Sequence, residues 1–263
     1  MHAMTLAEAK RTFRAFALGV CVRLAHNTTL VQWTQWIFLH RALGVFRFSI
    51  LHDPTPALEA RARFLQRRFT ERLHVNIVIH TVSRAFTSYE DDCNWCVQAN
   101  PSLVSWVLCA KGIDEVIASS NASQPLGKHL QTTCLEEKPV LSVGVRNARH
   151  GLAGLYEFPL ADPPNLRWLL NTRTVTAIGD RGPQCTNCDG GESSCACPIA
   201  NQADTQLSSC HVGLTWQRYS KATWGVLFQQ LHQQVGGAIA SSNPVLPYAA
   251  ELARLQANPL QGV

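Results

Sequence analysis

The strongest constraint on the fold is a regular alternation of short apolar runs and amphipathic runs in the first half of the chain. Four mainly apolar runs lie at residues 15–22, 45–51, 74–82 and 104–109. Runs of this length and composition are typical of buried strands. Because helical patterns lie between them, we predict an α/β fold, with a mostly parallel sheet covered by helices on both faces.

The first helical pattern covers residues 30–43. Its apolar residues recur every three or four positions, so they share one face of a helix, and His40 and the tryptophans of that face are expected in the core. Residues 27–29 (NTT) offer an N-cap, and Gly44 follows where a C-terminal cap belongs. The same periodicity predicts two further helices, at residues 57–69 and 92–103.

The second half of the chain carries weaker patterns. Residues 126–135 fit a short helix, and residues 140–145 fit a strand. Residues 181–197 are rich in Gly, Cys and Ser, so we expect a loop there. Residues 216–234 fit a strand followed by a helix, and residues 259–263 fit a loose tail.

Composition and charge argue against two classes of protein. The 263 residues carry a formal net charge of +5, only 16% are charged, and no long Lys/Arg run occurs. This balance suits a polyanionic ligand, but it argues against nucleic acid as a partner. The apolar stretch at residues 15–24 is interrupted by Arg23 and is too short to span a membrane. No signal-peptide cleavage site follows it, so we expect no leader or anchor within this chain.

The ten cysteines are many for a cytosolic enzyme of this length. They fit either the disulfides of a secreted protein or a metal cluster. Four of them fall within residues 181–197, namely Cys185, Cys188, Cys195 and Cys197. A Cys-x-x-Cys pair followed by a second pair is typical of Zn²⁺ sites, although the second pair is tighter here than usual. Disulfides, free thiols and a zinc site are the alternatives for this segment.

Polar residues follow three of the predicted strands. Arg23 and Asn27 come after the first strand, Asp53 after the second and Lys111 after the fourth. Ligands of open α/β sheets bind beyond the carboxyl ends of the strands, and Arg pairs bidentately with phosphate groups. We therefore predict a binding site from these residues. The alternative is that the two cations are solvated and that Asp53 only starts the turn at Pro54.

One stretch of the sequence resembles a known family. Residues 36–45 (WIFLHRALGV), followed by a strand pattern that ends at Asp53, are similar to glycosyltransferase family 92 and its relatives, formerly domain of unknown function 23. Their block reads roughly E-W-[IV]-x-[FY]-H-x-x-L-G-V. Here Gln35 stands in place of the Glu, and Leu39 in place of the aromatic residue.

Two further blocks extend the resemblance. Residues 106–107 (WV) and 112–117 (GIDEVI) stand where the relatives read W-[VLI] and D-x-D-E-F-[IL]. Residues 218–221 (RYSK) and His232 loosely match a Lys and a His near the end of the family domain. The similarity is closest over residues 15–117.

The resemblance implies a GT-A fold, in which a Rossmann-type sheet binds a nucleotide sugar. It implies transfer of a hexose, such as galactose, from a UDP-sugar donor to a glycan or glycoprotein acceptor, in the secretory pathway or Golgi. A divalent cation, usually Mn²⁺, would bridge the diphosphate and the D-x-D carboxylates. Residues 15–235 would then form the glycosyltransferase-like domain, residues 1–14 an N-terminal extension and residues 236–263 a C-terminal tail.

The D-x-D motif is incomplete in this chain, because Gly112 stands at the first Asp position and Asp114 at the second. A cation held by carboxylate oxygens neutralises the charge that develops on a diphosphate leaving group. We therefore predict Asp114 and Glu115 as metal ligands, with phosphates and waters filling the other positions. The alternative is a solvated turn, and Lys111 offers another way to neutralise phosphate.

The sequence does not single out a catalytic base. A carboxylate that deprotonates the acceptor hydroxyl would suit this chemistry, and Glu115, Glu157 and Asp162 are the alternatives. Three hypotheses follow for the whole chain. It is an active glycosyltransferase, a degenerate relative that keeps the fold and binds without transfer, or a small zinc-bearing interaction protein.

Overall fold

The structure is a computed structural model that describes residues 18–73, 75–82, 88–100, 104–119, 140–151, 154–157, 166–179, 182–186, 194–201 and 214–219. The helices of this part are α2 (Leu30–Ala42), α3 (Pro56–Leu73) and α4 (Tyr89–Ala99). The strands are β1 (Leu18–Arg23), β2 (Val45–His52), β3 (Asn76–Thr81), β4 (Trp106–Cys109), β5 (Glu115–Ser119), β6 (Val140–Gly151), β7 (Gly154–Glu157), β8 (Leu166–Asn171), β9 (Val175–Gly179), β10 (Gly182–Cys185), β11 (Cys195–Ala196), β12 (Ile199–Asn201) and β13 (Leu214–Tyr219).

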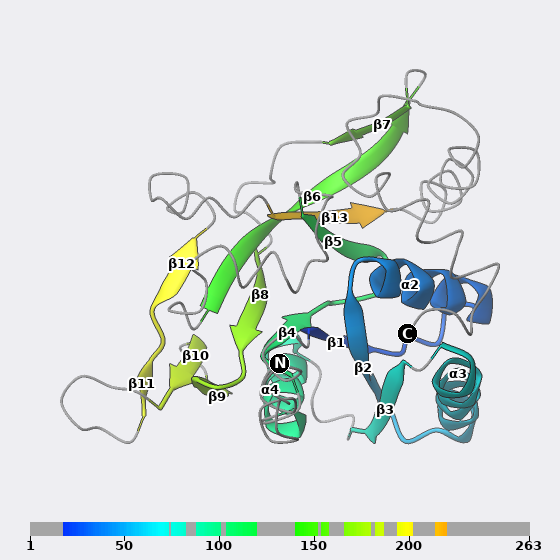
Figure 1. The fold of residues 1–263 in the computed structure, drawn as a ribbon, viewed down its shortest axis with the longest axis horizontal. Coiled ribbons are helices and arrows are strands. Elements are labelled where there is room, and N and C mark those ends of the chain that lie inside the picture. Colours follow the sequence, from blue (N-terminus) through cyan, green and yellow to red (C-terminus); the bar gives the residue numbers. More distant parts are fainter. Residues whose placement is uncertain are drawn as a thin grey trace, which may run out of the picture.

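The described strands form one large mixed sheet and one small sheet (Figure 1). Neighbours in the large sheet follow the order β3-β2-β1-β4-β8-β6-β13-β5, and β7 and β12 also pair with β6. The small sheet has the order β11-β10-β9. The chain is therefore an α/β protein, as the sequence predicts.

The first half of the sheet is parallel throughout. β1 pairs with β2 on one side and with β4 on the other, and β2 pairs with β3. These are the four strands predicted from apolar runs. Because all four run in the same direction, their carboxyl ends meet at one edge of the sheet, where the predicted ligand residues follow.

The ends of α2 and α4 are fixed by local side chains. Thr29 caps α2 in a capping box, since its hydroxyl accepts from the Gln32 N–H while the Gln32 side chain accepts from the Thr29 N–H. Gly44 follows α2 with a φ of 93°, a backbone conformation that favours glycine. The helix expected at residues 92–103 begins earlier, at Tyr89, because the Ser88 hydroxyl accepts from Asp91 N–H at 3.0 Å.

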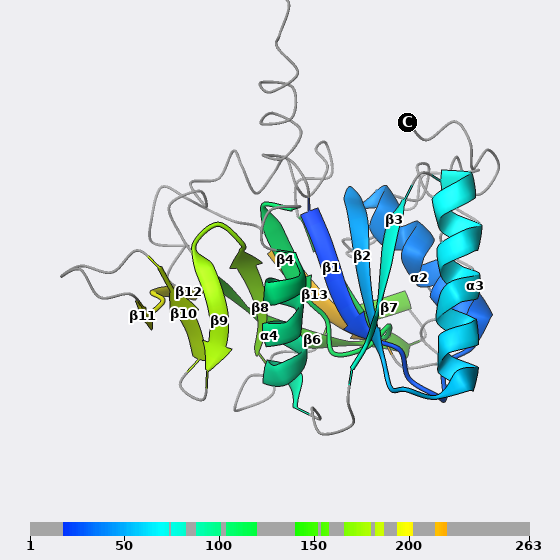
Figure 2. The same cartoon turned by 90° about the horizontal axis from the view of Figure 1, so that it is seen from below.

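The parallel strands are covered on both faces, as predicted. Figure 2 shows α4 in front of the strands and α2 behind them. Val20 and Val22 of β1 belong to the core cluster that contains the apolar faces of α2 and α3. Cys21, between them, belongs to a second cluster with Cys93 of α4. Successive side chains of a strand point to opposite faces, so one short apolar run serves two cores.

The prediction of a mostly parallel sheet is wrong for the second half. β8 pairs antiparallel with both β4 and β6, and β5 pairs antiparallel with β13, whereas β13 and β12 run parallel to β6. The sheet is therefore mixed. The prediction fails because apolar runs indicate strands but carry no information on strand direction.

The prediction of a loop at residues 181–197 is also corrected. β10 and β11 lie within it, and a disulfide joins Cys185 of β10 to Cys197. Alternate residues of β10 are buried, which is a strand pattern that its Gly and Pro content hides. The helix expected at residues 126–135, the one expected after β13, the extension at 1–14 and the tail at 236–263 lie outside the described residues.

Within the described ranges, no helix combines the length and the apolar character that a membrane crossing requires.

Candidate functional site

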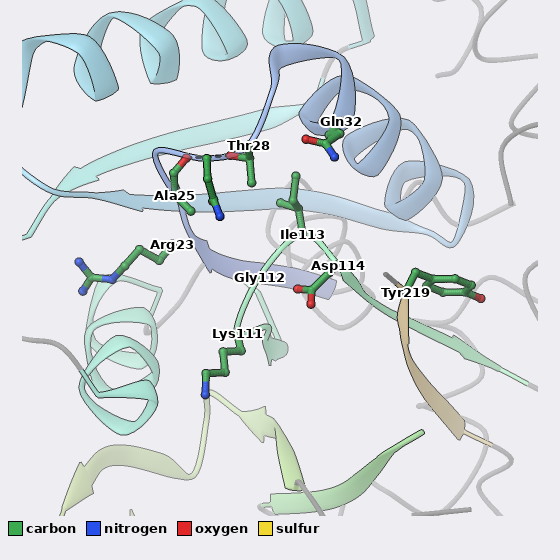
Figure 3. Close-up of a pocket in the computed structure, with 10 residues that line it drawn as sticks. Arg23, Ala25, Thr28, Gln32, Lys111, Gly112, Ile113, Asp114 and Tyr219 are labelled. Atoms are coloured by element: carbon green, nitrogen blue, oxygen red, sulfur yellow. Dashed lines mark hydrogen bonds between the residues drawn. The ribbon is translucent and has the colours of Figure 1, made fainter. Parts of the chain in front are cut away.

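A cavity of about 350 Å³ opens beyond the carboxyl ends of β1 and β4 (Figure 3). Its volume falls within the range of roughly 300–1,000 Å³ that is typical of small-molecule sites. Four residues that the sequence predicted as ligand contacts line it together: Arg23, Asn27, Lys111 and Asp114. Thr28, Gln32 and Tyr219 complete the polar lining, and Ala25, Gly112 and Ile113 contribute apolar or backbone surface.

One wall of the cavity is the segment between β1 and α2. Three interactions hold it in place. The Thr28 hydroxyl accepts a hydrogen bond from the Trp33 indole at 2.8 Å, and its carbonyl accepts one from Arg61 at 2.7 Å. Gln32, in the first turn of α2, completes the capping box and lines the cavity. The N-terminal end of a helix carries a partial positive charge, and the first turn of α2 contains no acidic residue, so this wall favours an anion.

Arg23 forms one ion-pair cluster beside the cavity. Its Nε donates to both carboxylate oxygens of Asp92, at 2.9 and 3.1 Å, and its Nη1 donates to Asp53 at 2.7 Å. The hydrogen bond with Asp92, opposed by partial burial, and the charges of both carboxylates raise the pKa of Arg23. Figure 3 shows the guanidinium turned toward α4, away from Asp114. Asp53 does not line the cavity itself and contributes to the site by holding Arg23. No sequence pattern indicates Asp92.

The opposite wall is the turn from β4 to β5. Its geometry places positions 112 and 114 on the same side, because a Cβ built on Gly112 would lie 2.6 Å from Oδ1 of Asp114. The Asp114 side chain is 51% exposed. Partial burial and the neighbouring Glu115 carboxylate raise its pKa, although Arg218 opposes the shift. Figure 3 shows that Lys111 extends away from Asp114.

Glu115 lies beneath this turn, and its side chain is fully buried. Its Oε1 accepts from Arg167 and Arg218, both at 2.6 Å, and its Oε2 accepts from Arg167 at 2.8 Å and from Lys111 N–H at 3.1 Å. Burial alone would raise the pKa of Glu115, but the two guanidinium groups outweigh it and lower that pKa. Both oxygens already accept several hydrogen bonds, so this carboxylate acts as an anchor for the turn.

Arg218 connects the anchor to the cavity. It is the cross-strand partner of Glu115 in the β13–β5 pair, and its Nε lies 3.6 Å from Asp114 Oδ2. The Tyr219 N–H also donates to the Asp114 carbonyl at 2.8 Å. β13 thus holds the backbone of the Asp114 turn and places a cation beside its carboxylate. No sequence pattern indicates Arg167, whereas Arg218 lies in the weakest of the three family-like blocks.

A cation in this cavity would take a single carboxylate ligand from the described residues. Within the described ranges, no group of three or more His, Cys, Asp and Glu side chains converges on a common point. Asp114 alone presents a half-exposed carboxylate to the cavity. Mg²⁺ and Mn²⁺ keep several waters and take phosphate oxygens as ligands, so a single carboxylate is compatible with a cation delivered together with a diphosphate.

Other candidate residues lie away from the cavity. His40 is buried as predicted, with Nδ1 3.0 Å from the Trp36 carbonyl, and burial lowers its pKa to about 4. Glu157 belongs to β7, which pairs with the far end of β6. Asp162 lies outside the described residues. None of the described carboxylates other than Asp114 lines the cavity as a catalytic base would.

Of the alternatives for the cysteines of residues 181–197, the structure shows disulfides. Cys185 pairs with Cys197, and Cys195 is disulfide-bonded as well. Cys188 lies outside the described residues. A sulfur in a disulfide is not available as the thiolate that Zn²⁺ requires, so a zinc site here would need these bonds to be reduced.

A scan against profiles of known protein families found no match to the chain, and a search of curated proteins found none of significant similarity.

Proposed function

We propose that the chain is a glycosyltransferase with a GT-A-type, Rossmann-like fold that transfers a hexose, such as galactose, from a UDP-sugar to a glycan or glycoprotein acceptor. One observation carries the proposal. Four polar residues that the sequence predicts as ligand contacts line a single cavity. They end or follow β1 and β4, so the cavity lies at the carboxyl ends of parallel strands. Ligands of α/β sheets bind at this edge.

The two walls of the cavity suit different parts of a nucleotide sugar. Asn27 on the α2 side offers an amide group that suits a ribose or a uracil, whereas the Thr28 hydroxyl is already bound to the Ala25 carbonyl and the Trp33 indole. Asp114 on the other side suits a divalent cation, which would supply charge stabilisation to the diphosphate as the glycosidic bond breaks. Lys111 also lines the cavity and supplies a cation that suits the phosphates, although its side chain extends away from Asp114.

Two residues of the proposed site act through others. Asp53 holds Arg23 together with Asp92, and Arg23 lines the cavity. Glu115, initially a candidate metal ligand, is better assigned to positioning Asp114 because its oxygens are bound to Arg167 and Arg218. The family resemblance also suggests the secretory pathway or Golgi as the location.

The proposal is tested by titrating the folded protein with UDP, UDP-galactose and UDP-glucose, each with and without Mn²⁺. We expect binding that strengthens with Mn²⁺ and that Asp114→Asn weakens about tenfold or more, because the variant removes the charge but not the shape of the side chain. Glu59→Gln on exposed α3 is the matched control and should bind normally. A folded protein that binds none of these nucleotides would rule out the proposal.

Gly112 favours a second candidate, a degenerate relative that binds a nucleotide sugar without transferring it. The first carboxylate of the motif is missing, and Arg218 already lies 3.6 Å from the second. Both features weaken a cation site. The two candidates differ in one measurement: the degenerate protein binds UDP-galactose but releases no UDP from it in the presence of Mn²⁺ and mixed glycan acceptors.

A further inference from the structure

Two reduced cysteines lie together under α4, outside the candidate site. Cys93 of α4 and Cys109 of β4 are both buried and free. Both side chains belong to one buried cluster that also contains Cys21 and Cys96. Tyr89 lies beside them, since its hydroxyl donates to the Cys109 carbonyl at 3.0 Å. The cluster is unrelated to nucleotide binding, so an inference from it does not depend on the proposed function.

A disulfide already joins α4 to the sheet beside this pair. Cys21 of β1 is bonded to Cys96 of α4, with their Cα atoms 6.0 Å apart. Cys109 is the register partner of Cys21 on the neighbouring strand, and Cys93 precedes Cys96 by one helical turn. α4 therefore lies at a distance from the sheet that permits a disulfide, and the second pair occupies the adjacent strand and turn.

We propose that Cys93 and Cys109 form a second disulfide, which links α4 to β4 next to the Cys21–Cys96 bond. The oxidant is a small-molecule disulfide such as oxidised glutathione. A sulfur–sulfur bond forms between the two side chains, the bond of the oxidant breaks, and the two electrons and two protons leave as two molecules of glutathione.

The oxidising environment that forms the Cys21–Cys96 bond also favours a bond between Cys93 and Cys109. Structural disulfides form mainly in oxidising environments, so conditions that form the Cys21–Cys96 bond also favour oxidation of the adjacent thiol pair. Burial raises the pKa of the Cys93 thiol, which makes it a poor nucleophile once α4 is docked. The second bond is therefore expected to close during folding, while both sulfurs are still accessible.

The bond would also stiffen the floor of the cavity. Cys109 ends β4, and the turn that carries Lys111 and Asp114 follows directly. Ala110, between them, donates its N–H to the Cys21 carbonyl at 2.9 Å. Two covalent links would then hold α4 against β1 and β4 immediately below this turn.

Peptide mapping tests the proposal on the full chain folded in a glutathione redox buffer. The protein is denatured, alkylated with iodoacetamide and digested without reduction. Trypsin releases residues 15–23, which contain Cys21, and residues 85–111, which contain the other three cysteines. We expect these two peptides to be linked and to carry no alkyl label. Chymotrypsin, which cuts at Trp95 and Trp106, should then yield Cys93 and Cys109 in cross-linked fragments.

Cys93→Ala is the matched control, because it leaves Cys109 without a partner. In this variant Cys109 should carry one label, which shows that the alkylating agent reaches it. The wild-type bond should also raise the melting temperature by about 5 °C relative to Cys93→Ala/Cys109→Ala. Labels on both Cys93 and Cys109 in wild-type protein would overturn the proposal, whether or not the Cys21–Cys96 bond has formed. Pairing of either residue with a different cysteine would overturn it as well.

Discussion

Two ion-pair clusters flank the cavity, and they are built in opposite ways. On one side, the single cation Arg23 holds the two carboxylates of Asp53 and Asp92, and all three side chains are 21–24% exposed. On the other side, the single carboxylate of Glu115 holds Arg167 and Arg218. There, the Glu115 and Arg167 side chains are nearly or fully buried, at 0% and 4% exposure.

This difference assigns the clusters different roles. Solvent reaches the Arg23 cluster and weakens its ion pairs, so its members can exchange partners when a charged ligand binds. The Glu115 cluster cannot exchange partners without leaving a buried charge unpaired. The first cluster is thus suited to contact a ligand, and the second to hold the Asp114 turn in place.

The largest effect is expected from Glu115→Gln. The variant removes the buried carboxylate that Arg167 and Arg218 share, and breaking a buried ion pair typically lowers the free energy of unfolding by about 3 kcal/mol. Urea denaturation followed by tryptophan fluorescence measures the change, with Glu59→Gln on the surface as a control that should not differ from wild type. A Glu115→Gln protein as stable as wild type would contradict the structural role of this cluster.

Acid pH should weaken the Glu115 cluster. The pKa of Glu115 is lowered below its ordinary value of 4.5, so its ion pairs stabilise the fold above that pH. The contribution is lost as the pH falls below 4.5 toward the folded-state pKa. The difference in stability between wild type and Glu115→Gln should therefore shrink between about pH 6 and about pH 3. A constant difference across this range would show that Glu115 acts by packing and not by charge.

Arg23→Gln should reverse the pattern, with a small effect on stability and a larger one on binding. Because the cluster is partly exposed, we expect the free energy of unfolding to fall by about 1 kcal/mol. UDP affinity should fall about tenfold, since the variant removes the positive charge that offsets the Asp53 and Asp92 carboxylates beside a phosphate-bearing ligand. Calorimetric titration with UDP measures the second effect, and equal UDP affinity in variant and wild type would remove Arg23 from the site.

The two clusters also show how far the sequence can predict this molecule. Arg23 and Asp53 were found because each directly follows a continuous apolar strand, and parallel strands bring such ends together. Similar local signals predict the four parallel strands and an N-cap within residues 27–29, which the structure places at Thr29. These features depend on residues that are close in the chain.

The second cluster depends on residues that are far apart. Arg167 and Arg218 lie 52 and 103 residues from Glu115, on strands whose antiparallel pairing no local pattern specifies. Without those partners, Glu115 looked like an exposed metal ligand next to Asp114. The same limit explains why the sequence predicts a mostly parallel sheet. The strands within residues 181–197 escape prediction for a local reason, because the Gly and Pro content of β10 hides its strand pattern.

The smallest expected effect comes from restoring the missing carboxylate of the D-x-D-like motif. A side chain at Gly112 would meet Asp114 Oδ1, the far end of a flexible side chain that can move aside, so Gly112→Asp should be accommodated. Two carboxylates would then face one cation, and Mn²⁺-dependent UDP affinity should rise about threefold to tenfold. Gly112→Ala adds the same Cβ without the charge and should show no such gain. If both variants bind UDP and Mn²⁺ alike, the turn from β4 to β5 is not the cation site, and the Arg23 side of the cavity must account for any binding alone.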